Sequence, residues 1–278
     1  MKGWWESFVP AEGAWYRWRL AGAEIFVCRR GCEWRSAVKS VPWTGGGAFP
    51  RGGGASRPEN AGPEEAAPLS ACPAGELTVA AGEGEYAALR PFFDEKPFLI
   101  KFSAVLRLFP GAETAVTVDL PPLLRFEADG TTLFSFRPFV SGDTWYGDTM
   151  KGFLCSCLAV DFAPYPKTAG PPLVPCTVSI KNSSALTAEL DHVLLYADEL
   201  SIYENYENSG ENGGGNGESS GGLLCDTPVI EIFDGDFRMS VKTAAEDARL
   251  VSEGVKNSVG DMLIRRGAEI IKNITGYS

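Results

Sequence analysis

The side chains best suited to bind a ligand or to react lie close together, in residues 142–152. Two carboxylates, Asp143 and Asp148, stand on either side of an aromatic pair, Trp145 and Tyr146. Two carboxylates that come close could hydrolyse a glycoside or bind Ca²⁺ through oxygen ligands. The rings could stack on a sugar or capture a peptide. A solvated loop with Trp145 closing one end of a sheet also accounts for the pattern. We therefore assign these four residues as candidate ligand-binding residues, and none as catalytic.

The cysteines suggest one metal site. Cys28 and Cys32 together with Cys155 and Cys157 could supply four thiolates to zinc. The spacing of Cys155 and Cys157 is shorter than that of a zinc knuckle, and on a strand both side chains would share one face. Free cysteine is among the most buried residue types. We therefore expect buried thiols here, and no metal site.

The chain has a single histidine, His192, within the apolar run of residues 190–195. A nucleophile–histidine site would need Ser183, Ser184 or Cys176 beside it in space, and no sequence signature of such a site is present. We expect His192 to pack in the core or at its edge.

Charge and hydropathy exclude several classes of partner. With 25 Lys+Arg against 36 Asp+Glu, the net charge is −11, which opposes binding to the phosphates of nucleic acid. The N-terminus lacks the apolar core of a signal peptide. No stretch approaches the roughly 18–20 apolar residues that span a bilayer. We expect a cytoplasmic protein without a transmembrane segment.

Period-two alternation dominates the chain and predicts a mainly β fold. Residues 14–20 and 24–28 alternate as a hairpin would. Asp129-Gly130 and Asp234-Gly235 are typical two-residue hairpin turns, and residues 182–184 are interpreted as a similar turn. No helical pattern separates these runs, so antiparallel pairing is expected. The sequence therefore predicts an antiparallel β-sandwich, either one large sandwich or two paired ones.

Composition divides the chain into four segments. Residues 1–43 form a hairpin region with six of the seven tryptophans. Residues 44–75 are rich in Gly and Pro and are expected to be a disordered insertion. They lack the Lys-Ser/Thr of a phosphate-binding loop, and no cofactor is expected. Residues 76–242 form the sandwich core, with a flexible Gly-rich loop at 208–222. Residues 243–278 form the last segment.

This last segment has a helical period. Apolar residues recur at intervals of three, four and seven; they are Ala248, Val251, Val255, Val259, Met262, Leu263, Ile270 and Ile274. Thr243 with Glu246 would form a capping box. We expect an amphipathic helix that packs on its own sheet, pairs with a second copy, or docks on a protein partner.

Three segments, residues 176–184, 191–195 and 199–203, carry a strand, an Asn/Ser turn and two further strands. In these segments the chain resembles an uncharacterised archaeal and bacterial domain-of-unknown-function family. The resemblance would extend over most of the chain outside the two Gly-rich tracts. The family brings no established activity, cofactor or catalytic residue, so it implies no role for any position here.

The leading hypothesis is a non-catalytic binding or assembly module on a β-sandwich scaffold. The alternative is a carbohydrate-binding module, or a glycoside hydrolase that uses Asp143 or Asp148. A third hypothesis, a helix lying on a membrane surface, is disfavoured because the polar face of the expected helix carries both signs of charge.

Overall fold

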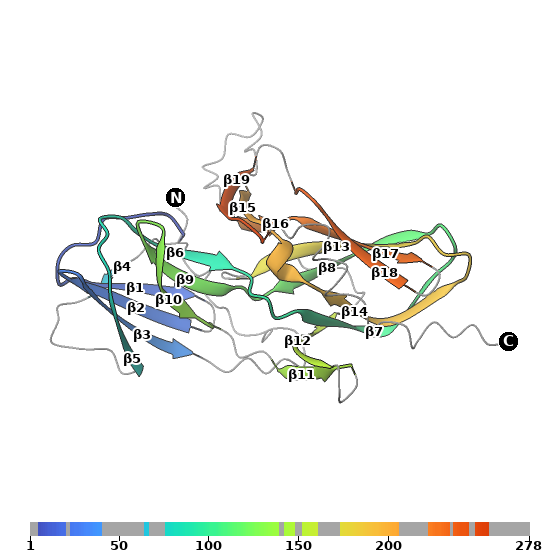
Figure 1. Ribbon diagram of the computed structural model, residues 1–278, viewed down its shortest axis with the longest axis horizontal. Helices are drawn as coiled ribbons and strands as arrows, with labels where there is room; N and C mark the ends of the chain where they lie inside the picture. The colour runs from blue at the N-terminus through green and yellow to red at the C-terminus, as the bar shows by residue number, and fades with distance from the viewer. Residues whose placement is uncertain are drawn as a thin grey trace, which may run out of the picture.

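The computed structural model describes residues 5–20, 23–40, 64–66, 76–138, 142–147, 152–160, 173–205, 222–233, 236–244 and 248–255. Within them the chain forms nineteen strands and one short 3₁₀ helix, η1 (Ala197–Glu199). Most strand pairs are antiparallel (Figure 1). The predicted mainly β class is therefore confirmed. No helix within these ranges is long and apolar enough to cross a membrane.

Two sheets make up the first half of the molecule, on the left of Figure 1. The five-stranded sheet has the order β4-β1-β2-β3-β5, with β1 (Trp15–Leu20), β2 (Ala23–Arg30), β3 (Glu33–Ser40), β4 (Glu64–Ala66) and β5 (Glu76–Ala81). The three-stranded sheet has the order β10-β9-β6, with β6 (Ala87–Phe92), β9 (Leu123–Ala128) and β10 (Thr131–Phe136).

Tryptophans of the N-terminal segment pack these two sheets together. Trp18 of β1 and Trp34 of β3 are buried, and their rings lie 6.1 Å and 5.3 Å from the ring of Phe126 on β9. The Trp34 indole N–H also donates to the carbonyl of Gly82, 2.9 Å away. Burial of side chains this large dominates the energetics of a small core, which explains why tryptophan is concentrated here.

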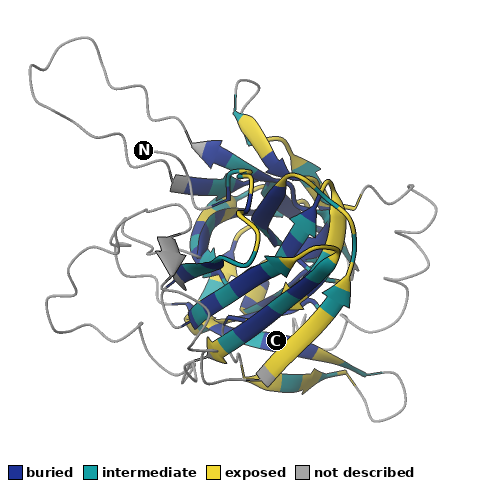
Figure 2. Ribbon diagram, turned by 90° about the vertical axis from the view of Figure 1, so that its left-hand side faces the viewer, coloured by how far each residue is buried: buried dark blue, intermediate teal, exposed yellow. Residues whose placement is uncertain are grey.

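Two four-stranded sheets make up the second half. One has the order β11-β12-β7-β14, with β7 (Phe98–Leu108), β11 (Asp143–Tyr146), β12 (Phe153–Val160) and β14 (Ala188–Leu195). The other has the order β18-β17-β13-β8, with β8 (Glu113–Leu120), β13 (Val174–Asn182), β17 (Thr227–Phe233) and β18 (Asp236–Lys242). Both sheets contribute to one hydrophobic core that continues into the first half. Buried residues alternate with more exposed ones along much of β8 and β14, and Figure 2 shows buried and exposed positions mixed along the strands of the molecule.

A small fifth sheet, the junction sheet, lies over the junction of the halves (Figure 1). Its order is β16-β15-β19, with β15 (Ile202–Asn205), β16 (Gly222–Cys225) and β19 (Arg249–Ser252). Arg90 of β6 donates to the carbonyl of Val251, 3.1 Å away, so β19 ties the halves together. Two described connections also pass between the halves: residues 93–97 join β6 to β7, and residues 121–122 join β8 to β9.

The expected antiparallel sheets are present, and two strand pairs depart from this pattern. β12 pairs in parallel with β7, and β13 pairs in parallel with β17. A parallel pair needs a long connection, which is usually a helix. Here the connection runs through strands of the other sheets, so no helical crossover is required.

Most of the predicted hairpins are confirmed. β1 pairs with β2, β9 with β10, and β17 with β18. Asp129 has φ 45° and Gly130 has φ 80°, as the tight turn between β9 and β10 requires. The turn at residues 182–184 is different, because it carries the chain from β13 in one sheet to β14 in the other.

The predicted C-terminal helix is not supported by the described part of residues 243–278. Arg249–Ser252 form strand β19, in which Tyr203 pairs with Leu250 and Ile202 with Ser252. Long-range pairing with β15 therefore overrides the local helical spacing. Residues 256–278 lie outside the described residues.

Asp119 on β8 predicts a dependence of stability on pH. Its Oδ1 atom is buried and accepts no hydrogen bond from a described residue, and burial raises the pKa of Asp119 to about 6. An acid whose pKa is higher in the folded than in the unfolded state destabilises the fold when ionised. Asp119→Asn should therefore raise the free energy of unfolding at pH 7.5 by about 2 kcal/mol. This gain should shrink as the pH falls through 6.

Urea unfolding of the wild type and of Asp119→Asn between pH 5 and 7.5 measures this gain in the free energy of unfolding. Asp129→Asn is a control of opposite sign, because backbone N–H groups of Glu85 and Tyr86 hydrogen-bond the Asp129 carboxylate and lower its pKa. A gain for Asp119→Asn that does not change with pH would contradict the assignment.

Candidate functional site

Strand β11 holds three of the four predicted site residues at the edge of its sheet. It pairs only with β12 among the described strands, with Asp143 opposite Ser156, Trp145 opposite Leu154 and Tyr146 opposite Phe153. Because side chains alternate along a strand, Asp143 and Trp145 share one face and Tyr146 lies on the other. The predicted residues therefore do not converge on one point.

The outward face of this hairpin is apolar and exposed. Trp145 and Leu154 are 53% and 54% exposed and are directly opposed across the two strands. Asp143 stands beside them and forms an ion pair with Lys96. We call Asp143, Trp145 and Leu154 the hairpin face. It presents a flat indole ring next to a carboxylate and an ammonium group.

The inward face is packed against the opposite edge of the sheet. The Tyr146 hydroxyl lies 3.2 Å from Nε2 of His192 on β14, with their rings 5.4 Å apart. The Tyr146 ring also lies 5.8 Å from that of Phe153. Burial raises the pKa of Tyr146, so its hydroxyl keeps its proton and can donate it in this hydrogen bond. The contact fixes the hairpin, and sequence reasoning missed it.

A β-bulge shapes the histidine side of this contact. Leu190 of β14 pairs with Leu106 of β7, but His192 pairs with Lys101, so residues 102–105 of β7 bulge opposite Asp191. The Asp191 Oδ1 atom lies 2.5 Å from His192 Nδ1. A bulge changes the direction in which side chains point, and here two neighbouring residues come together. The resulting carboxylate–imidazole–phenol chain orients the imidazole toward Tyr146.

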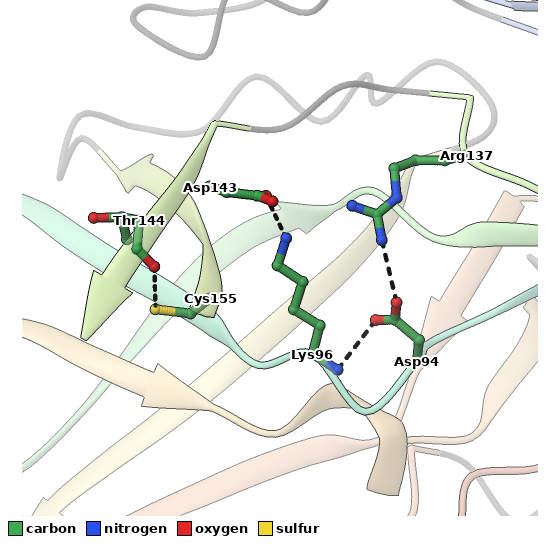
Figure 3. Close-up of polar contacts among 6 residues, drawn as sticks. All are labelled: Asp94, Lys96, Arg137, Asp143, Thr144 and Cys155. Atoms are coloured by element: carbon green, nitrogen blue, oxygen red, sulfur yellow. Dashed lines mark hydrogen bonds and ion pairs between the residues drawn. The ribbon is translucent and has the colours of Figure 1, made fainter. Parts of the chain in front are cut away.

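A polar cluster anchors the other end of the hairpin to the junction (Figure 3). Lys96 of the connection between β6 and β7 pairs with Asp143, and its backbone N–H lies 3.3 Å from Oδ1 of Asp94. Asp94 in turn pairs with Arg137, 3.4 Å away. The segments that pass between the halves are thus linked to β11 by charged contacts, and the sequence offered no signal for this linkage.

The Cys155 thiol lies under the same hairpin. It is buried and 3.5 Å from the carbonyl oxygen of Thr144. Burial raises the pKa of Cys155 to about 11, so it is a neutral thiol at physiological pH. In the described ranges no group of three or more His, Cys, Asp or Glu residues is placed to hold a metal ion.

A cavity of about 290 Å³ opens at the junction itself. Its charged lining residues are Asp94, Glu95, Asp198, Glu253 and Arg125. The Nε atom of Arg125 lies 2.6 Å from the Glu127 carboxylate, so its charge is already compensated. No residue of the hairpin face lines this cavity.

The remaining candidates have other neighbours. Asp148 lies outside the described residues. The Ser183 hydroxyl donates to Glu231, 2.5 Å away, and the Ser184 hydroxyl to Asn182, 2.8 Å away. Cys176 meets Cys225 instead of His192. The partner that the structure gives to the histidine is therefore Tyr146.

Comparison with known proteins places the chain in a family. The sequence model described as "Protein of unknown function (DUF432)" matches residues 4–209. The chain belongs to the DUF432 family. The match contains all three segments on which the resemblance rested, and the expectation of a family of unknown function is confirmed. No curated protein and no solved structure matches the chain.

The DUF432 match ends before strands that complete the fold. β17, which begins at Thr227, lies between β13 and β18 in its sheet. Without it, β13 would keep β8 on one side but lose its parallel partner along residues 179–182. The unit that folds therefore extends past residue 209, at least to β19.

Proposed function

We propose that this DUF432 protein is a non-catalytic binding module on a β-sandwich scaffold, and that the hairpin face is its recognition surface. The observation that carries the proposal is the opposed pair of Trp145 and Leu154, each more than half exposed. A strand that is packed on one side and presents an aromatic ring on the other is held ready for a ligand, and such preorganisation lowers the cost of binding.

The chemistry of the face favours a carbohydrate ligand. A sugar ring offers an apolar face that can stack on the Trp145 indole, with hydroxyl groups around its rim. Asp143 and Lys96, paired beside that ring, can accept and donate hydrogen bonds to such hydroxyls. Leu154 widens the apolar platform.

Two features favour binding over glycoside hydrolysis. The Asp143 carboxylate is engaged in an ion pair with the Lys96 ammonium, whereas a glycosidase needs a carboxyl group that is available to donate a proton or to attack the sugar. The aromatic hydroxyl nearest to it in sequence, that of Tyr146, faces away from Trp145 and toward His192.

A glycan array probed with the wild-type protein and with Trp145→Ala tests the proposal. Loss of the stacked ring should weaken binding to the glycans that the wild type retains by about tenfold, since a stacked aromatic contributes up to about 1.5 kcal/mol beyond the area it buries and tenfold corresponds to about 1.4 kcal/mol. Trp145→Phe should recover part of the affinity. Phe109→Ala removes another exposed aromatic, 68% exposed and outside the hairpin face, and should bind as the wild type does. Absence of any bound glycan, or equal binding by Trp145→Ala, would overturn the proposal.

An assembly module could also act by self-association. Residues 256–278, at the end of the predicted helix, are the segment that would mediate it. Because β19 belongs to the fold, any truncation that tests this role should end after Val255, where the Val255 N–H donates to the carbonyl of Asp198, 2.7 Å away.

A further inference from the structure

Two buried thiols from different strands meet in the second half of the molecule. Cys176 on β13 is fully buried and Cys225 on β16 is 5% exposed. Strands β13 and β16, which carry them, are neighbours in the fold, and the Cys176 side chain is close enough to influence the Cys225 thiol. The Cys225 Sγ atom also lies 3.6 Å from the carbonyl oxygen of Pro175, the residue before Cys176. Because Pro175 and Cys176 are consecutive, the Cys225 sulfur lies beside Cys176, and a disulfide between the two residues would join neighbouring strands.

The two thiols are protected in the closed fold. Burial and the hydrogen bond with Cys176 raise the pKa of Cys225, and a neutral, buried thiol reacts slowly. Strand β16 is nevertheless only four residues long and lies at the edge of its sheet. Short edge strands open locally at small cost compared with global unfolding. Such an opening would expose Cys225 while Cys176 stays in the core.

We propose that Cys176 and Cys225 are a redox-active dithiol that closes to an intramolecular disulfide on reaction with a small-molecule disulfide such as oxidised glutathione. In the first step the Cys225 thiolate attacks one glutathione sulfur, the glutathione S–S bond breaks, and one glutathione leaves as a thiol. Cys176 then attacks the Cys225 sulfur of the mixed disulfide and releases the second glutathione. The protein loses two hydrogen atoms, that is two protons and two electrons, and one oxidised glutathione becomes two reduced molecules.

The bond would fasten the junction sheet to the second half. Residue Asp226, next to Cys225, accepts hydrogen bonds from the backbone N–H groups of Ser201, 2.9 Å away, and Ala244, 3.2 Å away. β19 of the same sheet receives the Arg90 hydrogen bond from the first half. Oxidation would therefore hold β16, and with it this sheet, against β13.

The test uses the full chain, reduced and then incubated with oxidised glutathione. Peptide mapping by mass spectrometry should find residues 176 and 225 in one cross-linked species that has lost two hydrogens. The melting temperature should rise by about 5–10 °C, because the bond closes a loop of about 50 residues in the unfolded chain. Dithiothreitol should reverse both changes. Cys32→Ala removes a cysteine that is exposed and should leave the bridge intact, whereas Cys225→Ala should abolish it.

Two results would overturn the inference. One is that Cys176 and Cys225 both remain free thiols when exposed Cys32 has already formed its glutathione adduct. The other is a stable glutathione adduct on Cys225 that never resolves to the bridge. Because the mapping is made on the wild-type protein, it does not depend on a cysteine variant that folds.

Discussion

Replacing Asn182 with alanine is expected to lower the free energy of unfolding by about 3 kcal/mol. Asn182 is fully buried at the end of β13. Its amide donates to the carbonyl oxygens of Leu108 and Leu186, each 2.8 Å away, and its Oδ1 accepts from the backbone N–H of Ser184 at 3.0 Å. Alanine would leave three backbone groups without this partner, at about 1–3 kcal/mol for each that stays buried and unsatisfied.

The loss matters because these bonds connect the two large sheets of the second half. Leu108 ends β7 in one sheet, while Asn182 ends β13 in the other. Chemical denaturation with a fluorescence readout measures the change. Ser183→Ala, one residue further on, removes a surface hydrogen bond to Glu231 and should stay within about 0.5 kcal/mol of the wild type. Equal stability of Asn182→Ala and Ser183→Ala would show that Asn182 is not the connection described.

Gly254→Ala is expected to have a comparable effect, about 3 kcal/mol, by displacing the end of β19. A Cβ atom at this position would lie 2.5 Å from the carbonyl oxygen of Glu199 and 2.7 Å from the carbonyl carbon of Leu200. These are backbone atoms, which cannot rotate away. The chain around residue 254 must then move away from η1. This movement would break the hydrogen bonds that the Gly254 N–H donates to the Ser201 hydroxyl and the Val255 N–H donates to the Asp198 carbonyl.

Gly142→Ala is the matched control for this prediction. A Cβ at Gly142 meets no atom within 4 Å, so the same substitution should be almost without effect there. Differential scanning calorimetry of both variants makes the comparison. If Gly254→Ala melts at the temperature of the wild type, the close approach of β19 to η1 is wrong, and with it the account of how the junction is tied.

Local sequence patterns predicted the parts of the fold that depend on local chemistry. Alternation identified the strands, and the turn at Asp129 was predicted because only a few residue types accept a positive φ. The same logic placed a turn at residues 182–184, but could not tell a hairpin from a change of sheet. That distinction depends on Leu108, which lies more than seventy residues away in the sequence.

The C-terminal segment shows how long-range pairing can override a local period. Ala248, Val251 and Val255 have helical spacing, yet Val251 is buried in a strand that pairs with β15. Hydrophobic intervals of three and four over so few residues are compatible with either structure. The parallel pairs of β7 with β12 and of β13 with β17 were missed for a related reason, since their crossovers are made of strands.

Among the candidate site residues, sequence predicted which types would be near one another but not which face each would occupy. Trp145 and Tyr146 are neighbours, so a strand sends them to opposite faces, and only the surroundings decide which face is exposed. The partner of Tyr146 is His192, on a different strand, and its orientation depends on the bulge at Asp191. No pattern in a single sequence indicates that bulge.

The proposed recognition surface depends most on Trp145 being the ring that contacts the ligand. Fluorine NMR of protein labelled with 5-fluorotryptophan measures this directly, with the Trp145 resonance assigned from Trp145→Phe. We predict that its solvent isotope shift in heavy water exceeds those of the buried Trp18 and Trp34. We also predict that the glycan with the strongest array signal moves this resonance and reduces that shift. A Trp145 resonance that stays in place while the glycan is bound would contradict the account.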